Sequence, residues 1–239
     1  MRNVATVAGR EVGAYFLSPI AYAVNAIFLF ACGLAFGLGT FSNGGEASLR
    51  SMFDFWIVLI MVFVLPMLTM RLISDELRSG TIETLMTVPV TETDIVLGKF
   101  LGAFAFFLIL LVAMLLYPLL VSMYGSIDLK LLLCHYIGLL LLGALYISVG
   151  LFFSACTKHQ VIAVLISFAL LALMTFASHA LAQTVPAGWI RVVMQQISVR
   201  THFNDFVRGM LDLNHVVFFI TTTVFFLFLT VKRLEMRRW

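Results

Sequence analysis

Long apolar runs separated by short polar stretches make up most of this chain of 239 residues. A helix needs about 20 mainly apolar residues to cross a bilayer core that is roughly 30 Å thick. Six runs qualify, at residues 20–41, 53–73, 95–124, 131–156, 160–183 and 215–231. The last run is short, but Lys232 and Arg233 at its end can reach the membrane surface. The pattern predicts an all-α integral membrane protein with six transmembrane helices, in which residues 1–239 form a single membrane domain.

A further amphipathic helix is predicted before the first span. Its apolar residues share one side of a helix, at Val4, Val7, Ala8, Val12 and Tyr15. Arg10 and Glu11 are placed elsewhere on the helix, as expected of a segment that lies at the membrane interface. Pro19 then redirects the chain into the bilayer.

The external segment before the last span, residues 184–214, also carries a helical pattern. The apolar positions with a three-and-four spacing are Phe203, Phe206, Val207, Met210 and Leu211. We therefore expect an external amphipathic helix whose apolar face dips into the edge of the membrane. Arg208 and Asp212 are four residues apart, so they are expected to form an ion pair on this helix.

The polar segment at residues 74–94 separates the second and third spans. Asp75 and Glu76 are expected to open a short helix that Gly80 interrupts, and a second apolar helical pattern runs from there to Pro89. Thr91 then has Asp94 three residues later, which is the capping pattern at the start of a helix. The sequence predicts two short helices lying across the membrane surface.

Charge distinguishes this segment from an ordinary connecting loop. It has five acidic residues, at Asp75, Glu76, Glu83, Glu92 and Asp94, and a single base at Arg78. An acidic surface of this kind suits a partner that presents basic residues. A solvated face of a simple loop explains the same pattern, and the chemistry alone does not separate the two interpretations.

Composition and the distribution of basic residues extend this picture. The chain is 62% hydrophobic and 11% charged, whereas a typical soluble domain is about 25% charged. With both termini in the cytoplasm, ten of the fifteen Lys and Arg residues lie on the cytoplasmic side and five on the other. Basic residues favour the cytoplasmic side, so this orientation is predicted. The net charge of +3 is too small to indicate nucleic-acid binding.

Motifs for catalysis or metal binding are not evident in the sequence. The three cysteines lie in or beside apolar runs without metal-ligand spacing, and no grouping of His, Asp, Glu or Cys has a catalytic arrangement. His135 and His215 fall at predicted span ends, where they can reach water. The run VLGKFL, residues 96–101, lacks the upstream glycine and the Ser or Thr that a phosphate-binding loop requires. The chain is therefore not expected to hydrolyse ATP by itself.

Residues 75–101, DELRSGTIETLMTVPVTETDIVLGKFL, closely resemble the coupling segment of permease subunits in type-two ABC transporters, the exporter class. The positions that fill the family pattern are Glu76, Gly80, Thr81, Glu83, Leu85, Pro89, Gly98 and Lys99. Residues 10–36 and 202–239 are similar to the branch that includes the gliding-motility-associated permease. The resemblance thus covers both ends of the chain and the polar segment.

The resemblance implies a cytoplasmic coupling helix between spans two and three that docks on an ATP-binding cassette subunit. The implied coupling residues are Asp75, Glu76, Gly80, Thr81, Glu83, Leu85 and Pro89. Glu76 and Glu83 would supply charge-assisted contacts, and Gly80 a close approach or a bend. Lys99 would hold the start of the third span at the interface, although snorkelling explains it equally well.

The same resemblance implies a multi-pass permease of the bacterial inner membrane, with no cofactor of its own and with ATP and Mg²⁺ on the partner subunit. A second permease copy or a related permease would complete the complex, and Gly33 and Gly37 form a GxxxG pair in the first span that suits such an interface. The substrate is not indicated. An alternative is that ATP-driven motion passes to a periplasmic or membrane auxiliary protein without solute transport.

Overall fold

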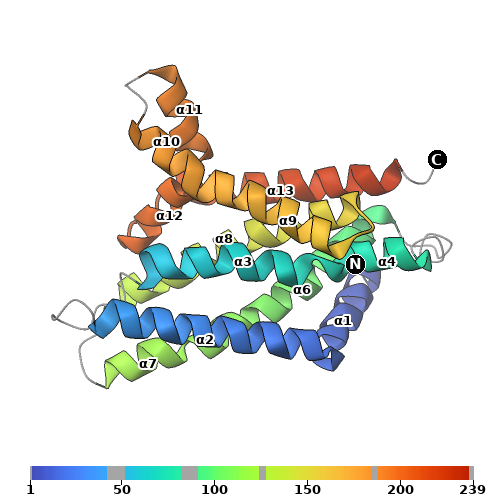
Figure 1. Cartoon of the computed structure of the whole chain (residues 1–239), viewed down its shortest axis with the longest axis horizontal. Helices are drawn as coiled ribbons and strands as arrows, with labels where there is room; N and C mark the ends of the chain where they lie inside the picture. Colours follow the sequence, from blue (N-terminus) through green and yellow to red (C-terminus); the bar gives the residue numbers. More distant parts are fainter. Residues whose placement is uncertain (1, 42–51, 82–90, 124–127, 185–187, 237–239) are drawn as a thin grey trace.

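The computed structural model describes residues 2–41, 52–81, 91–123, 128–184 and 188–236, and every regular element in them is a helix (Figure 1). The first half contains α1 (Arg2–Leu17), α2 (Pro19–Phe41), the π-helix η1 (Met52–Trp56), α3 (Ile57–Thr69), α4 (Arg71–Ser79), α6 (Glu92–Met114) and α7 (Leu116–Ser122). The second half contains α8 (Leu129–Cys156), α9 (Gln160–Ala172), the π-helix η2 (Leu173–Ala177), α10 (Ser178–Thr184), α11 (Trp189–Ile197), α12 (Val199–Val207) and α13 (Leu213–Glu235).

Five helical stretches in the described residues are long and apolar enough to cross a membrane. They are Ile57–Ser79, Glu92–Ser122, Leu129–Cys156, Gln160–Leu181 and Leu213–Glu235. The α1–α2 pair provides a sixth candidate if both helices count as one span, because the chain bends by 74° between them. The all-helical fold is thus confirmed, with five to six candidate spans where six were predicted.

Helix α8 lies at the centre of the bundle, in contact with α3, α4, α6, α9, α12 and α13 (Figure 1). Three of its glycines make room for side chains of its neighbours. Gly143 faces Phe107 of α6, Gly150 faces Thr69 of α3, and a Cβ atom on Gly138 would come within 2.8 Å of Phe206 Cβ in α12. Small residues of this kind let apolar helices pack closely where lipid supplies no hydrophobic driving force.

The second span extends further than the sequence pattern indicated. Pro66 lies inside α3, and the helix is interrupted at Met70 before α4 continues in the same stretch to Ser79. Asp75 and Glu76 therefore lie within the extension of the span and do not open a separate surface helix. The expected interruption at Gly80 is confirmed, because this glycine ends α4 with φ of 75°.

The external segment differs from its prediction. Helix α12 ends at Val207, and Gly209 has φ of 79°, so Met210 and Leu211 are exposed residues outside the helix. Phe203, Phe206 and Val207 are buried against the bundle and do not dip into the membrane edge. The three-and-four spacing correctly predicted that these three residues lie on one apolar face of a helix. This face packs against other helices of the protein.

The predicted Arg208–Asp212 pair is not formed. Arg208 follows the end of α12, whereas Asp212 is the N-cap of α13 and accepts a hydrogen bond from Asn214 N at 3.0 Å. Among the described residues no ion pair joins the two. A spacing of four residues brings two side chains together only when both lie in one helix, and α12 ends at Val207, before Arg208 and Asp212.

Candidate functional site

Helix α1 packs against α6 through two glycines. A Cβ atom on Gly98 would come within 2.6 Å of Val7 Cβ, and one on Gly102 would come within 2.6 Å of Glu11 Cβ. The two glycines are four residues apart and so share one face of α6. Glu11 lies on the packed side of α1, with its side chain only 13% exposed, and not on a separate polar side as the sequence pattern indicated.

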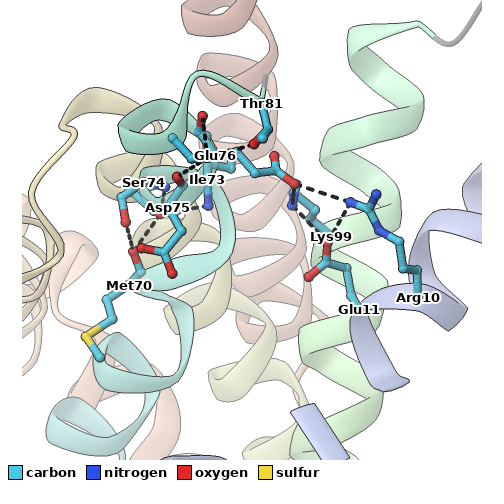
Figure 2. A network of polar contacts seen from close by, with 11 residues as sticks. Arg10, Glu11, Met70, Ile73, Ser74, Asp75, Glu76, Thr81 and Lys99 are labelled. Carbon is cyan, nitrogen blue, oxygen red and sulfur yellow. Dashed lines mark hydrogen bonds and ion pairs between the residues drawn. The ribbon is translucent and has the colours of Figure 1, made fainter. Parts of the chain in front are cut away.

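Glu11 belongs to a network of four charged side chains from three helices (Figure 2). Lys99 Nζ of α6 donates to Glu11 Oε1 of α1 at 2.9 Å and to Glu76 Oε1 of α4 at 2.8 Å. Arg10 Nη2 reaches Glu76 Oε1 at 3.3 Å and Glu11 Oε1 at 3.5 Å. The network has two acids and two bases, so it is electrically balanced.

Burial makes Lys99 the centre of this network. Its side chain is 2% exposed, whereas that of Arg10 is 57% exposed. Snorkelling, one of the two expectations for Lys99, is therefore wrong: the ammonium group points to two carboxylates inside the protein. A buried ion pair that loses one partner destabilises a protein by about 3–5 kcal/mol, because the remaining charge is left uncompensated. The carboxylates of Glu11 and Glu76 together compensate the charge of the Lys99 ammonium group in its buried position.

A second set of polar contacts fixes the start of α4 to α8. Ser154 Oγ accepts hydrogen bonds from Ile73 N at 3.1 Å and Ser74 N at 3.0 Å, and donates to Met70 O at 2.9 Å. The interruption at Met70 leaves these backbone groups without their usual helical partners, which would be costly in an apolar environment. One hydroxyl group from α8 satisfies all three, so α4 is held at both its beginning and its middle.

The predicted coupling residues that are described lie along α4 and just beyond it. Asp75 Oδ1 accepts a hydrogen bond from Gln160 Nε2 at the start of α9. Ser79 Oγ and Thr81 Oγ1 are 2.8 Å apart on either side of Gly80, where the chain is exposed. Asp75 and Glu76 thus have partners within the chain, while Gly80 and Thr81 face outward. The predicted positions Glu83, Leu85 and Pro89 lie outside the described residues.

The chain re-enters the bundle at Thr91 with the predicted cap. Asp94 N donates to Thr91 Oγ1 at 3.2 Å, and Thr91 N donates to Asp94 Oδ2 at 3.4 Å. This reciprocal arrangement confirms the capping box and fixes the first turn of α6. Lys99 lies two turns further along the same helix, so the position of the cap and that of the charge network are linked by one rigid element.

The GxxxG pair of the first span consists of Gly33 and Gly37. Within the described part of the chain, only Gly33 has another helix packed closely against it. A Cβ atom on Gly33 would meet Tyr117 Oη at 3.3 Å, whereas one on Gly37 would meet nothing within 4 Å. Gly33 thus contributes to packing against α7. The role of the pair in a dimer stays a prediction.

Of the two histidines that were expected to reach water, His135 is buried and His215 is partly buried. His135 is 2% exposed and lies against the ring of Phe53, with 4.5 Å between ring centroids. The side chain of His215 is 15% exposed, and its Nε2 is 2.6 Å from Asp205 Oδ2. Its Nδ1 is 2.6 Å from Nδ1 of His202, so three residues connect the end of α12 to the start of α13.

Sequence reasoning missed Glu11, Ser154, Gln160 and the histidine pair as members of these networks. Their partners are 88, 81, 85 and 13 residues away, respectively, and helical periodicity relates only residues within a few turns. One signal was present: Gly98 and Gly102 are a small-residue pair on the third span, which indicates a closely packed neighbour. It does not say which helix that neighbour is.

Comparison with known protein families decides the class of this chain. A family model described as ABC-2 family transporter protein matches residues 38–231. The chain belongs to the ABC-2 transporter family. A search of curated proteins gave no match.

Membership of the ABC-2 family confirms the coarser part of the resemblance. The chain is a multi-pass membrane component of the permease type, and in this family the ATPase is a separate cassette component. Glu76 and Lys99 lie in the matched range, whereas Arg10 and Glu11 precede it. The gliding-motility branch stays a prediction.

Proposed function

We propose that this chain is the transmembrane permease subunit of an ATP-driven exporter, and that the connection from α4 to α6 is where it docks on a separate ATP-binding cassette subunit. The family match carries the first part of the proposal. The second part is supported by the charge network, which ties both ends of that connection to each other through Glu76 and Lys99.

The proposed coupling depends on how force would pass through α4 and α6. Closure of the cassettes would push on the connection that begins at Gly80 and Thr81, and the exposed position of these two residues suits a contact surface. Glu76 and Lys99 would then make α4 and α6 move together, and Glu11 would carry the movement to α1. Glu76 acts in this scheme as a positioning residue, since Oε1 is already occupied within the chain, and Glu83 remains the candidate for direct contact with the cassette.

The remaining parts of the complex are proposals of the same kind. ATP and Mg²⁺ would bind to the cassette subunit, and a second copy of this chain or a related permease would complete the membrane part. The chain would lie in the bacterial inner membrane with both termini in the cytoplasm, which places α4 and the end of α13 on the cassette side. These two elements lie at the same end of the bundle (Figure 1).

The docking proposal is tested by reversing one charge in the connection. Glu83→Arg should leave membrane insertion intact but abolish co-purification with the cassette subunit and permease-dependent ATPase activity. Glu235→Arg is the matched control, because it changes the charge equally at the same end of the bundle, on a side chain that pairs only with Lys232 among the described residues. Unchanged co-purification of the Glu83→Arg variant would contradict the docking proposal.

Mechanical coupling to an auxiliary protein is the second candidate function, and α11 is the observation that favours it. This helix has no buried residue, and Trp189, Val192 and Val193 are 78%, 63% and 42% exposed. It projects from the end of the bundle opposite α4 (Figure 1). Replacing these three residues with serine should release an auxiliary protein while ATPase coupling is kept. Loss of solute export with no protein released would exclude this candidate.

A further inference from the structure

Helix α11 presents large apolar side chains that the described part of the protein does not cover. Between 38% and 78% of the surface is exposed at Trp189, Ile190, Val192, Val193 and Ile197. The helix has no buried residue, and it lies outside the stretches that are long and apolar enough to cross a membrane. Exposed apolar surface of this kind marks contact with a protein partner or with a membrane.

The polar residues of α11 lie opposite its apolar side. On a helix with 3.6 residues per turn, Trp189, Val193 and Ile197 follow one another along one side. Arg191 and Gln195, which are also exposed, lie on the other side. Apolar and aromatic residues on one face with arginine on the other are typical of helices that lie in the plane of a membrane surface. Tryptophan is itself enriched at this interface.

The position of α11 in the fold places it at the edge of the membrane. It packs against α10, and the first residues of α10, Ser178–Leu181, belong to the candidate span Gln160–Leu181. From Leu181, α10 continues only to Thr184, a rise of roughly 5 Å at 1.5 Å per residue. Figure 1 shows α11 at the side of the bundle, at a level along the long axis that α2 and α3 also reach. The helix therefore lies beside the membrane boundary and not in the water beyond it.

The apolar side of α11 continues a surface that faces lipid. Most residues in the span formed by α9, η2 and α10 are not buried within the chain. Leu173 of η2 and Leu181 of α10 are at least half exposed. Because α10 carries Leu181 and contacts α11, the lipid that covers Leu181 is also adjacent to α11.

We propose that α11 lies in the plane of the membrane surface, at the end of the bundle opposite α4. Trp189, Val193 and Ile197 contact the upper part of the acyl chains, and Arg191 and Gln195 face the headgroups and water. The contact of the external segment with the membrane is thereby assigned to α11, whereas α12 packs inside the protein.

This placement does not depend on the proposed docking of the cassette subunit. It restricts the second candidate function, because an auxiliary protein would have to displace lipid to reach α11.

Tryptophan fluorescence of the full chain in lipid vesicles tests the proposal. With Trp56→Phe and Trp239→Phe, Trp189 is the single tryptophan of the chain. Lipids with bromine near the headgroup end of the acyl chain should quench its emission most, and iodide in water least. Strongest quenching by iodide would overturn the proposal, and so would strongest quenching by bromine near the terminal methyl group. Protection from all three quenchers would overturn it as well, because protein would then cover the helix.

Two variants of this chain form a matched pair. Val193→Asp and Gln195→Asp each add one negative charge to α11, the first on its apolar side and the second on its polar side. Val193→Asp should lose quenching by brominated lipid and gain quenching by iodide, whereas Gln195→Asp should behave as the parent chain does. An equal response of the two variants would contradict the proposed orientation of the helix.

Spin labels keep the test valid if the chain with a single tryptophan does not fold. Cys32 and Cys134 are buried, and Cys156→Ser removes the remaining cysteine that is partly exposed. A label on Val193→Cys should collide mainly with oxygen, which dissolves in lipid. A label on Gln195→Cys should collide mainly with a nickel chelate, which stays in water. Collisions dominated by the nickel chelate at both positions would overturn the proposal.

Discussion

Individual residues show where local chemistry predicts structure and where it does not. The capping box of Thr91 and Asp94 was predictable because its two members are three residues apart. Lys99 was not, because its partners Glu11 and Glu76 are 88 and 23 residues away. A lysine near the end of an apolar run looks the same in the sequence whether it reaches the membrane surface or pairs inside the protein.

Glu11→Gln should lower the melting temperature of the purified chain, because it removes one of the two carboxylates that compensate the buried Lys99. The loss should be about 1.5–3 kcal/mol, the range for a hydrogen bond to a charged group. Glu235→Gln is the control, because its side chain is 42% exposed and pairs with the exposed Lys232, and it should change the stability by no more than about 0.5 kcal/mol. Equal melting temperatures for Glu11→Gln and wild type would show that the network contributes nothing to stability.

His202 gives the chain a pH dependence whose sign follows from its surroundings. Burial lowers the pKa of His202, the charge of His215 lowers it further, and the Gln196 carbonyl and Asp205 act in the opposite direction. His202 Nε2 donates to Gln196 O, and its Nδ1 lies 2.6 Å from Nδ1 of His215. Burial is the largest of these influences, so the pKa of His202 lies below its ordinary value.

The folded state should therefore lose stability as the pH falls. Unfolded histidine has a pKa of about 6.5, and the folded value is lower, so the unfolded state binds more protons in this range. Stability should be full above about pH 7 and should decline as the pH falls through 6.5 towards the folded pKa. Melting temperatures measured from pH 7.5 to 5 should show this decline in the wild type and a smaller one in His202→Gln. A larger decline in His202→Gln would contradict the interpretation.

At the scale of helices, apolar runs predicted the elements well, but their ends and contacts less well. The α6–α7, α8 and α9–α10 stretches begin and end within three residues of the predicted spans. The second span was predicted to end at residue 73, yet α4 continues to Ser79, since polar residues there find partners in α6, α8 and α9. The hydropathy of a segment measures how favourably it is placed in lipid. It does not show whether a polar residue finds hydrogen-bond partners inside the helical bundle.

Gly98→Ala tests the packing of α1 on α6. The added Cβ atom would come within 2.6 Å of Val7 Cβ and 3.2 Å of Val4 O, so α1 must move away and the distance from Lys99 to Glu11 must grow. Overpacking of this kind typically costs about 1–3 kcal/mol. Gly13→Ala is the control, because a Cβ atom there meets nothing within 4 Å. A melting temperature for Gly98→Ala that equals the control would mean that α1 does not pack there.

The whole molecule combines a bundle around α8 with a charge network at the end where α4 ends and α6 begins, whereas the contacts among His202, Asp205 and His215 join α12 to α13 elsewhere (Figure 1). Six apolar runs predicted the class of protein, and the family match from residue 38 to 231 agrees with it. The arrangement of the site depended on contacts between α1, α4, α6, α8 and α9, which no local pattern contains. The central claim is that this end of the bundle receives the cassette subunit.

Site-specific photo-crosslinking in the intact membrane tests that claim most directly. A photoreactive residue at Thr81, which is exposed beside Gly80, should crosslink to the co-expressed ATP-binding cassette subunit. The same residue at Val193, on the exposed helix α11 at the other end of the bundle, should not. A crosslink to the cassette from Val193 and none from Thr81 would contradict the account.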